Sequence, residues 1–263
     1  MLNEWQAKDT LCEIGRRIWQ RGYVAANDGN LSCRVGKDLV VATPTMVSKG
    51  FMNPGDMVSV DLEGRQVGGS LKPTSELKVH LNIYRSRPDV FSVVHCHPPH
   101  ATAFCVARRQ LPKCVLPEVE ILLGQIPIVP YATPGTEEFA RSIDPWIQTH
   151  VAFLMANHGT ITLGADPLEA YYRTETLDQY CRVLILAAGI GDWQMLDYSS
   201  MNDIFRIRET LGLKDSRSLE QGLCEVCRPG VEPDSKPATP PIPDRGIVED
   251  IVRDILKEKG LLP

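Results

Sequence analysis

The sequence of 263 residues predicts an α/β protein, because segments with the spacing of amphipathic helices alternate with short apolar segments typical of strands. Leu11, Ile14 and Ile18 lie on one side of a predicted helix over residues 3–21. Residues 151–156 are all apolar, as in a strand buried inside a sheet. With 43% apolar and 23% charged residues, a chain of this length can bury a substantial core.

Charge and composition exclude several classes of partner. A net charge of −5 and a pI near 5.7 leave no basic face for nucleic acid or an anionic membrane surface. No secretory leader opens the sequence, and no apolar run approaches the ~18 residues that span a membrane. The eight cysteines lack the spacing of a disulfide scaffold and predict reduced thiols, and Cys224 and Cys227 form a lone pair without a metal partner. We expect a soluble, cytoplasmic enzyme.

Two polar loops accompany the first predicted strands. Gly22 ends the first helix, and residues 25–30 form a turn-rich loop before a predicted hairpin of residues 31–35 and 39–43. A second polar loop then leads to a predicted strand at residues 57–61. Backbone N–H groups and amide side chains in such loops can hold an anion, although a simple turn has the same composition.

A further helix is predicted to begin at Thr74 or Ser75, either of which is a good N-cap, and to end at about Arg85. The N-terminus of a helix attracts anions through its free N–H groups and its dipole. Glu76 then has two interpretations, as an acid that complements the dipole or as a carboxylate that acts with histidines elsewhere. His80, one turn later, is expected to be packed or solvated rather than a metal ligand.

Histidines stand at the ends of two predicted strands. A strand over residues 91–95 leads into His95 and His97, which point to one side because alternate residues of a strand share a face. Two such imidazoles can bind zinc, although two surface histidines would give the same pattern. The apolar strand at residues 151–156 leads to a third histidine, His158. Catalytic zinc sites commonly use three protein ligands and leave one position open.

The remaining predicted elements continue the alternation of helices and strands. They are a helix at residues 101–107, an edge strand at 126–131 marked by prolines, a helix at 134–143, a strand at 161–163 and a helix at 167–188. His100 is expected to have a structural role. Glu118 and Glu120, ahead of the edge strand, either contact a substrate or face solvent.

Six short motifs occur in one order along the chain. They are Gly29-Asn30-Leu31-Ser32, Thr43-Pro44-Thr45, Thr74-Ser75-Glu76, His95-Cys96-His97, Pro130-Tyr131-Ala132-Thr133-Pro134-Gly135-Thr136 and Asn157-His158-Gly159. With these motifs the sequence resembles the class II aldolase/adducin family over roughly residues 5–212. The resemblance implies a three-layer αβα fold with a mostly antiparallel central sheet, which we place in residues 1–214. It also implies a homotetramer with active sites at the subunit interfaces.

The resemblance implies a role for each matching residue. His95, His97 and His158 would hold Zn²⁺ or another divalent metal. Glu76 would bind the metal in the empty enzyme and then act as the catalytic base on the substrate. The phosphate of a sugar phosphate would be bound by four polar residues, Asn30, Thr45, Thr74 and Ser75.

The implied reaction is cleavage of a deoxyketose-1-phosphate to dihydroxyacetone phosphate and L-lactaldehyde. L-fuculose-1-phosphate and rhamnulose-1-phosphate are the candidate substrates. Other reactions on the same scaffold stay open, namely epimerisation of a pentulose phosphate and dehydration or decarboxylation of a sugar phosphate. A non-catalytic, adducin-like binding module is a further alternative, which the complete set of histidines and Glu76 disfavours.

Two departures from the family pattern concern substrate binding. Met46 follows Thr45 where the aldolases usually have a glycine whose N–H helps to hold the phosphate. The aldolases also use tyrosines of a neighbouring subunit as proton donors. Leu116 and Leu211 fall near the places expected for these tyrosines, and Tyr131 is a weak substitute.

The C-terminal segment has a different organisation. Residues 215–244 are rich in proline and predict an extended linker. Residues 245–263 place Ile247, Ile251 and Ile255 at intervals of four, as in an amphipathic helix. A linker with a short apolar helix resembles the encapsulation peptides that dock on shell proteins of bacterial microcompartments. The alternative is that this helix folds back on its own tetramer.

Overall fold

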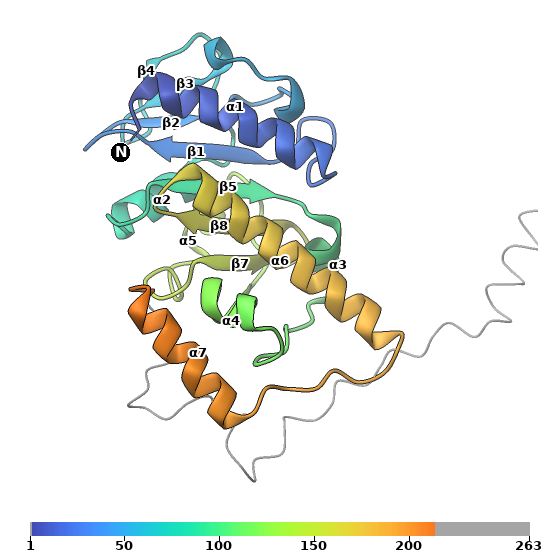
Figure 1. Cartoon of the computed structure of the whole chain (residues 1–263). Coiled ribbons are helices and arrows are strands. Elements are labelled where there is room, and N and C mark those ends of the chain that lie inside the picture. The colour runs from blue at the N-terminus through green and yellow to red at the C-terminus, as the bar shows by residue number, and fades with distance from the viewer. Residues whose placement is uncertain (1, 214–263) are drawn as a thin grey trace, which may run out of the picture.

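The structure is a computed structural model that describes residues 2–213, and it contains an eight-stranded sheet (Figure 1). The order of the strands across the sheet is β4-β3-β2-β1-β5-β8-β7-β6. Their bounds are β1 Asn30–Arg34, β2 Val40–Ala42, β3 Val58–Val60, β4 Gln66–Gly68, β5 Ser92–Cys96, β6 Ile128–Val129, β7 Ala152–Met155 and β8 Gly159–Gly164. All neighbouring strands are antiparallel except β6 and β7, which confirms the predicted mostly antiparallel sheet.

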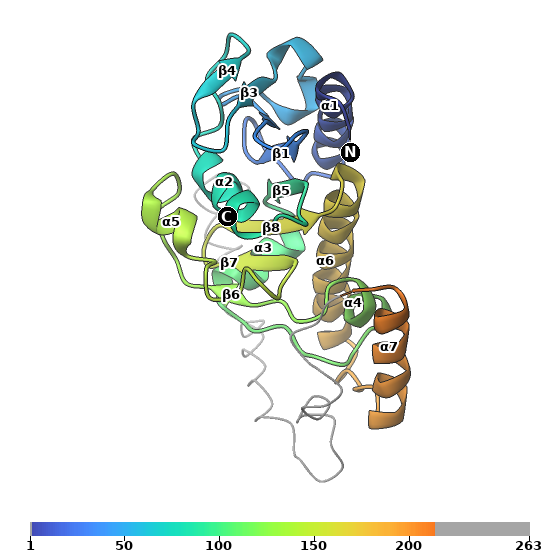
Figure 2. The ribbon, with the colours of Figure 1, turned by 90° about the vertical axis from the view of Figure 1, so that its left-hand side faces the viewer.

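Helices cover both faces of the sheet, as Figure 2 shows from the side. They are α1 Glu4–Gln20, α2 Leu77–Ser86, α3 Pro99–Ala107, α4 Pro117–Leu122, α5 Glu137–Arg141, α6 Pro167–Ala188 and α7 Tyr198–Thr210, with short 3-10 helices η1 Lys49–Phe51 and η2 Pro54–Asp56. Helices α2 and α5 bury one face of the sheet, and α1, α3 and α6 bury the other. Within β5, Val93 packs under α2 whereas its neighbour Val94 packs under α1. The predicted three-layer αβα arrangement is therefore confirmed.

Most predicted elements occur close to their expected bounds, but the start of α2 differs. Neither Thr74 nor Ser75 is its N-cap, because the helix begins at Leu77 with Glu76 in the N-cap position. The Thr74 hydroxyl instead accepts a hydrogen bond from the backbone N–H of Glu76 at 3.3 Å. A tight turn therefore precedes the helix, and Glu76 stands at its very beginning.

Helix α7 and strand β4 were not among the predicted elements. Helix α7 follows Asp197, whose side chain accepts a hydrogen bond from the backbone N–H of Ser200. It buries Met201, Ile204 and Phe205 and lies beside α4 (Figures 1 and 2). The linker, the predicted terminal helix, Cys224 and Cys227 lie outside the described residues, so the domain boundary at residue 214 stays a prediction.

Five of the described cysteines are free and buried, namely Cys12, Cys33, Cys96, Cys105 and Cys181. Cys114 is disulfide-bonded, so the prediction that every thiol is reduced is wrong for this residue. The spacing of cysteines along the chain does not reveal which of them approach one another in the fold. Among the described helices, none is long and apolar enough to cross a bilayer.

The pairing of the central strands positions the predicted site. Asn30 and His95 are direct partners in the antiparallel β1–β5 ladder, so their side chains lie on the same face of the sheet. Helix α2 covers this face and starts at Glu76. Strands β7 and β8 are joined by a tight turn in which Asn157 has a φ of +54° and His158 follows. Three separate elements therefore deliver side chains to one end of the sheet.

Candidate active site

Three histidine rings converge at the ends of β5 and β7. The ligand atoms of His95, His97 and His158 all lie within 4.8 Å of one another. The centroids of the three rings are 4.7, 5.0 and 5.1 Å apart. His95 belongs to β5, His97 follows this strand, and His158 lies in the turn between β7 and β8. The predicted meeting of three imidazoles, remote along the sequence, is confirmed.

Hydrogen bonding determines which nitrogen of His95 faces the cluster. Its Nδ1 atom lies 2.8 Å from the carbonyl oxygen of Thr160, which only accepts, so Nδ1 carries the hydrogen and donates. The Nε2 atom then faces His97, whose own Nε2 atom is 3.3 Å away. Metal-binding histidines are commonly held in this way, with the second ring nitrogen donating to a carbonyl.

Glu76 spans two of the three histidines. Its Oε2 atom lies 3.1 Å from Nε2 of His95, and its Oε1 atom lies 3.5 Å from Nε2 of His158. The residue is buried. A carboxylate therefore faces the same point as the imidazoles and completes a mixed nitrogen and oxygen donor set.

This donor set fits a divalent cation. The Nε2 atoms of His95 and His97 face each other at 3.3 Å, and two lone pairs approach so closely only with a proton or a cation between them. Imidazole nitrogens together with one carboxylate are ligands that zinc and related ions prefer.

The electrostatics of the site favour neutral imidazoles at His97 and His158 beside an ionised Glu76. Burial and the charge of His95 lower the pKa of His97 to about 4 and that of His158 to about 3. Burial alone would lower the pKa of His95, but the charge and hydrogen bond of Glu76 raise it overall. Burial opposes ionisation of Glu76, yet His95 and Asn30 hold its pKa well below the ordinary value. Neutral imidazole and ionised carboxylate are the forms that bind metal.

A chain of buried hydrogen bonds supports Glu76 from inside the protein. The Asn30 side-chain amide donates to Oε2 of Glu76 at 2.9 Å. The amide oxygen therefore faces Nε2 of His80, 2.6 Å away, so this nitrogen carries the hydrogen. His80 Nδ1 then accepts from the Ser32 hydroxyl at 2.7 Å, and Ser32 Oγ lies 2.6 Å from the Tyr84 hydroxyl. His80 is packed, as predicted, and it orients the amide of Asn30.

The histidines and Glu76 line a cavity of about 200 Å³. The four residues predicted to bind phosphate, Asn30, Thr45, Thr74 and Ser75, line the same cavity. Hydroxyl and amide groups of this kind donate to phosphate oxygens. The structure thus brings together all the predicted site residues, and phosphate binding by these four stays a prediction.

Comparison with known proteins agrees with this geometry. A sequence profile described as the class II aldolase and adducin N-terminal domain matches residues 9–185. The chain belongs to this family. An L-fuculose phosphate aldolase from Methanococcus maripaludis is 38% identical over 171 residues, which cover 65% of this chain and 92% of that protein.

Other relatives in the class II aldolase family differ in reaction. A 3-oxo-tetronate 4-phosphate decarboxylase from Haemophilus influenzae is 31% identical over 186 residues, which cover 69% of this chain and 88% of that protein. Among solved structures, an L-fuculose 1-phosphate aldolase matches with a TM-score of 0.71 and 26% identity, covering 79% of this chain and 96% of that one. These similarities establish the family and leave more than one reaction for this chain.

Met46, the departure from the family's glycine, keeps the backbone conformation that a glycine favours. Its φ is +60°, in the left-handed region that side chains with a Cβ rarely adopt. Its side chain is 77% exposed, and its sulfur lies 3.6 Å from Nδ2 of Asn27. The loop beside the cavity therefore retains its shape at a cost in backbone strain.

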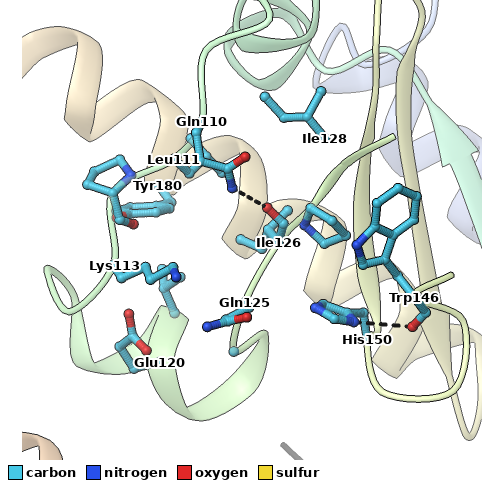
Figure 3. Close-up of a pocket in the computed structure, with 14 residues that line it drawn as sticks. Gln110, Leu111, Lys113, Glu120, Gln125, Ile126, Ile128, Trp146, His150 and Tyr180 are labelled. Carbon is cyan, nitrogen blue, oxygen red and sulfur yellow. Dashed lines mark hydrogen bonds between the residues drawn. The ribbon is translucent and has the colours of Figure 1, made fainter. Parts of the chain in front are cut away.

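A larger cavity, of about 320 Å³, shares none of its lining residues with the histidine site (Figure 3). In Figure 3, the Gln110 side chain donates to the carbonyl oxygen of Ile126, and His150 lies against Trp146. Nδ1 of His150 is also 2.9 Å from the hydroxyl of Thr149. Among the described residues, this cavity offers one histidine, which is engaged by its own turn, so the candidate metal site lies at the smaller cavity.

Two other predicted residues, His100 and Glu120, have structural positions. His100 Nδ1 lies 2.9 Å from Asp178 Oδ2, which confirms its structural role. Glu120 is buried and accepts a hydrogen bond from the backbone N–H of Cys114 at 2.6 Å, so the solvent-exposed alternative is wrong for it. It lines the larger cavity rather than the active site. Glu118 is exposed, as expected.

Sequence reasoning missed two charged residues at the active-site cavity. Asp28 lies with its carboxylate 3.5 Å from Nδ1 of His97, and Lys49 is buried at the cavity wall. Both occur in loops that resemble ordinary turns, so the sequence carries no signal that separates them from surface residues. Tyr131, the weak substitute for a catalytic tyrosine, is half-exposed and does not line the cavity.

Proposed function

We propose that the protein is a divalent-metal-dependent aldolase that cleaves a deoxyketose-1-phosphate to dihydroxyacetone phosphate and L-lactaldehyde. The observation that carries the proposal is the convergence of three imidazoles and the Glu76 carboxylate beside a polar cavity. The relatives named L-fuculose phosphate aldolase support L-fuculose-1-phosphate as the first candidate substrate. Rhamnulose-1-phosphate is the second candidate.

Aldol cleavage breaks one carbon–carbon bond and transfers two protons. The bond between the third and fourth carbons breaks as the hydroxyl of the fourth carbon loses its proton, and the third carbon later gains a proton. A Zn²⁺ or similar ion held by His95, His97 and His158 would supply positive charge to the substrate oxygens on which negative charge develops. Glu76, which lines the cavity, can carry the proton of the third carbon, as acid in cleavage and as base in condensation.

The polar residues of the cavity have a positioning role in this proposal. Asn30, Thr45, Thr74 and Ser75, which carry amide and hydroxyl groups, line the same cavity as the histidines. A phosphate held by these groups would fix the sugar relative to Glu76. Fixing the substrate in this way removes translational and rotational freedom before the chemical step.

The proposal is tested by assaying L-fuculose-1-phosphate and L-rhamnulose-1-phosphate side by side with metal-loaded protein. Dihydroxyacetone phosphate, measured by coupled reduction with NADH, is the expected product of at least one substrate. Formation of an isomeric pentulose phosphate from a five-carbon substrate would instead indicate epimerisation. Absence of dihydroxyacetone phosphate from both deoxyketose phosphates would contradict the proposed substrates.

The second candidate function is decarboxylation of a 3-oxo acid that carries a phosphate. Two observations favour it, namely the decarboxylases at 31% and 29% identity and the missing counterparts of the aldolase tyrosines. Loss of carbon dioxide leaves an electron pair on the second carbon, and its negative charge is shared with the 3-oxo oxygen, where the same donor set would stabilise it. Release of carbon dioxide from 3-oxo-tetronate 4-phosphate, without any aldol cleavage, would favour this function over the first.

Assembly as a homotetramer with active sites at subunit interfaces is part of the proposal. Its support is membership of the family and the lack of a candidate tyrosine in the cavity among the described residues. Light scattering after size-exclusion chromatography is expected to give four chains per particle. A monomer with full activity would contradict this assembly.

The C-terminal segment, residues 245–263, is proposed to dock on a microcompartment shell protein, a role supported by its amphipathic pattern and the linker before it. Lactaldehyde is reactive and volatile, which gives a reason to confine the enzyme. A fusion of residues 228–263 to a fluorescent protein is expected to form foci in a compartment-forming host. Diffuse fluorescence would count against docking and favour contact with the protein's own tetramer.

A further inference from the structure

Lys49 is a buried cation at the active-site cavity, and its side chain is 1% exposed. Lysine is rarely buried so completely unless an acid is paired with it. Its Nζ atom donates instead to the backbone carbonyls of Asn27 at 2.9 Å and Val47 at 2.5 Å. These neutral acceptors use two of the three ammonium hydrogens. Among the described residues, no carboxylate is hydrogen-bonded to this charge.

The backbone that carries Lys49 is held tightly against α1. A Cβ atom at Gly15 of α1 would lie 2.5 Å from the carbonyl oxygen of Lys49, and one at Gly50 would lie 2.4 Å from Trp19. Glycine at both positions therefore permits η1 to pack directly on α1. From this fixed support the Lys49 side chain reaches the two loops that line the cavity.

The charged groups around Lys49 leave its charge only partly compensated. Asp28 is the acid that acts on it electrostatically, but its side chain is 47% exposed and lies beside His97. Glu76 faces the histidine cluster, and α1 meets η1 through the uncharged Gly15. Burial lowers the pKa of Lys49 to about 8, as expected for an ammonium group that lacks a close counter-charge.

We propose that Lys49 supplies the counter-charge for the phosphoryl group of the substrate. Its ammonium group lies behind the two loops that contain Asn27 and Val47, whose carbonyls it contacts. This inference rests on the proposed function and names the residue that selects a phosphorylated sugar over its unphosphorylated analogue. The hydroxyls of Thr45, Thr74 and Ser75 give direction to the phosphate, whereas Lys49 gives charge. A cation in buried surroundings acts on an anion more strongly than one in water.

Inorganic sulfate is the probe that tests this inference, because it keeps a double negative charge throughout the neutral and alkaline range. Its affinity for the zinc-loaded, full-length protein is measured by equilibrium dialysis between pH 6.5 and 9.5. In the parent protein the affinity is expected to be constant below pH 8. Above pH 8 it should fall by up to about tenfold per pH unit as Lys49 loses its proton.

Two variants distinguish the contribution of Lys49 to sulfate binding from that of other titrating groups. Lys49→Met is expected to weaken sulfate binding at pH 7 by roughly tenfold or more and to remove the alkaline loss. Lys37→Met removes an exposed lysine far along the hairpin. This variant should bind sulfate with the same affinity and the same pH dependence as the parent protein. A loss of affinity caused by another titrating group would persist in Lys49→Met, so the two origins are distinguishable.

The outcomes also separate this inference from the proposed function. Equal sulfate affinity in the parent and in Lys49→Met overturns the role of Lys49 and leaves the aldolase proposal intact. A parent protein whose sulfate affinity does not change with pH overturns it as well, even if the variant fails to fold. A parent protein that binds no sulfate contradicts both the role of Lys49 and the phosphate site of the proposed function.

Discussion

The Oε2 atom of Glu76 lies 3.1 Å from Nε2 of His95, which joins the N-cap of α2 to the end of β5. The two residues meet because α2 covers the face of the sheet on which His95 is paired with Asn30. Both line the same cavity. Glu76 can therefore contact a cation among the histidines and also a substrate beside it.

Replacing Glu76 by glutamine should separate metal binding from catalysis. Glutamine has nearly the same size and still offers one oxygen, but it cannot carry a proton. We expect Glu76→Gln to retain the metal while kcat falls by about 10²–10⁴-fold. Metal content by mass spectrometry and steady-state rates check this outcome. Glu118→Gln, at an exposed glutamate, is the matched control, and a fully active Glu76→Gln would exclude Glu76 as the group that carries the proton.

Replacing His80 should reveal the cost of breaking the buried hydrogen-bond chain. His80→Phe leaves the amide oxygen of Asn30 without its partner at 2.6 Å, whereas the Ser32 hydroxyl keeps its contact with Tyr84. Each buried polar group that loses its partner costs about 1–3 kcal/mol. Urea denaturation should therefore give a free energy of unfolding lower by about 1–3 kcal/mol. A variant as stable as the parent would show that the chain has no energetic role.

The same histidine predicts a loss of stability in acid. Burial lowers the pKa of folded His80 to about 3, whereas an unfolded histidine titrates near ~6.5. Below pH ~6.5 the unfolded chain binds a proton that the folded chain does not. The contribution of His80 to stability is therefore complete above this pH and falls as the pH is lowered towards the pKa of the folded state. One histidine contributes up to about 1.4 kcal/mol per pH unit.

This acid dependence is measured on metal-free protein, by urea denaturation between pH 7.5 and 5. His97 and His158 also have lowered pKa values, so the parent protein should lose stability steeply. In His80→Phe the slope should be smaller by up to the contribution of one proton. Identical slopes in the two proteins would mean that His80 does not titrate as its burial predicts.

Met46 provides a test of backbone strain beside the cavity. Its φ of +60° costs a residue with a Cβ about 1–2 kcal/mol, part of which glycine's greater unfolded-state freedom offsets. Met46→Gly is therefore expected to raise the free energy of unfolding by about 0.5–1 kcal/mol. Val67→Gly, at an exposed position of β4, should instead lower it. A destabilised Met46→Gly would indicate that the methionine side chain contributes more by contact than it costs in strain.

The sequence predicted some features of the metal site from local patterns and others only from the family resemblance. The side-by-side placement of His95 and His97 followed from strand alternation. His95 lies in β5 and His97 follows directly after its last residue. The arrival of His158 at the same point depends on the order of β5, β8 and β7 across the sheet, which local patterns do not contain. That step came from the family resemblance.

Other features depend on contacts between distant segments. The burial of Glu120 is explained by the backbone N–H of Cys114, which a loop brings to it. The role of His80 depends on Ser32 and Asn30 of β1, which face α2 across the core. Helix α7 carried a usable signal, because its buried residues Met201, Ile204, Phe205 and Arg208 have helical spacing after the N-cap Asp197.

The proposed activity requires one divalent ion that is shared by His95, His97 and His158. Anomalous X-ray diffraction at the zinc edge, on crystals of zinc-loaded protein, tests this most directly. We predict a single peak per chain at about 2.1 Å from a ring nitrogen of each histidine. A chain without a peak at the three histidines would contradict the account and would favour a non-catalytic, adducin-like binding module.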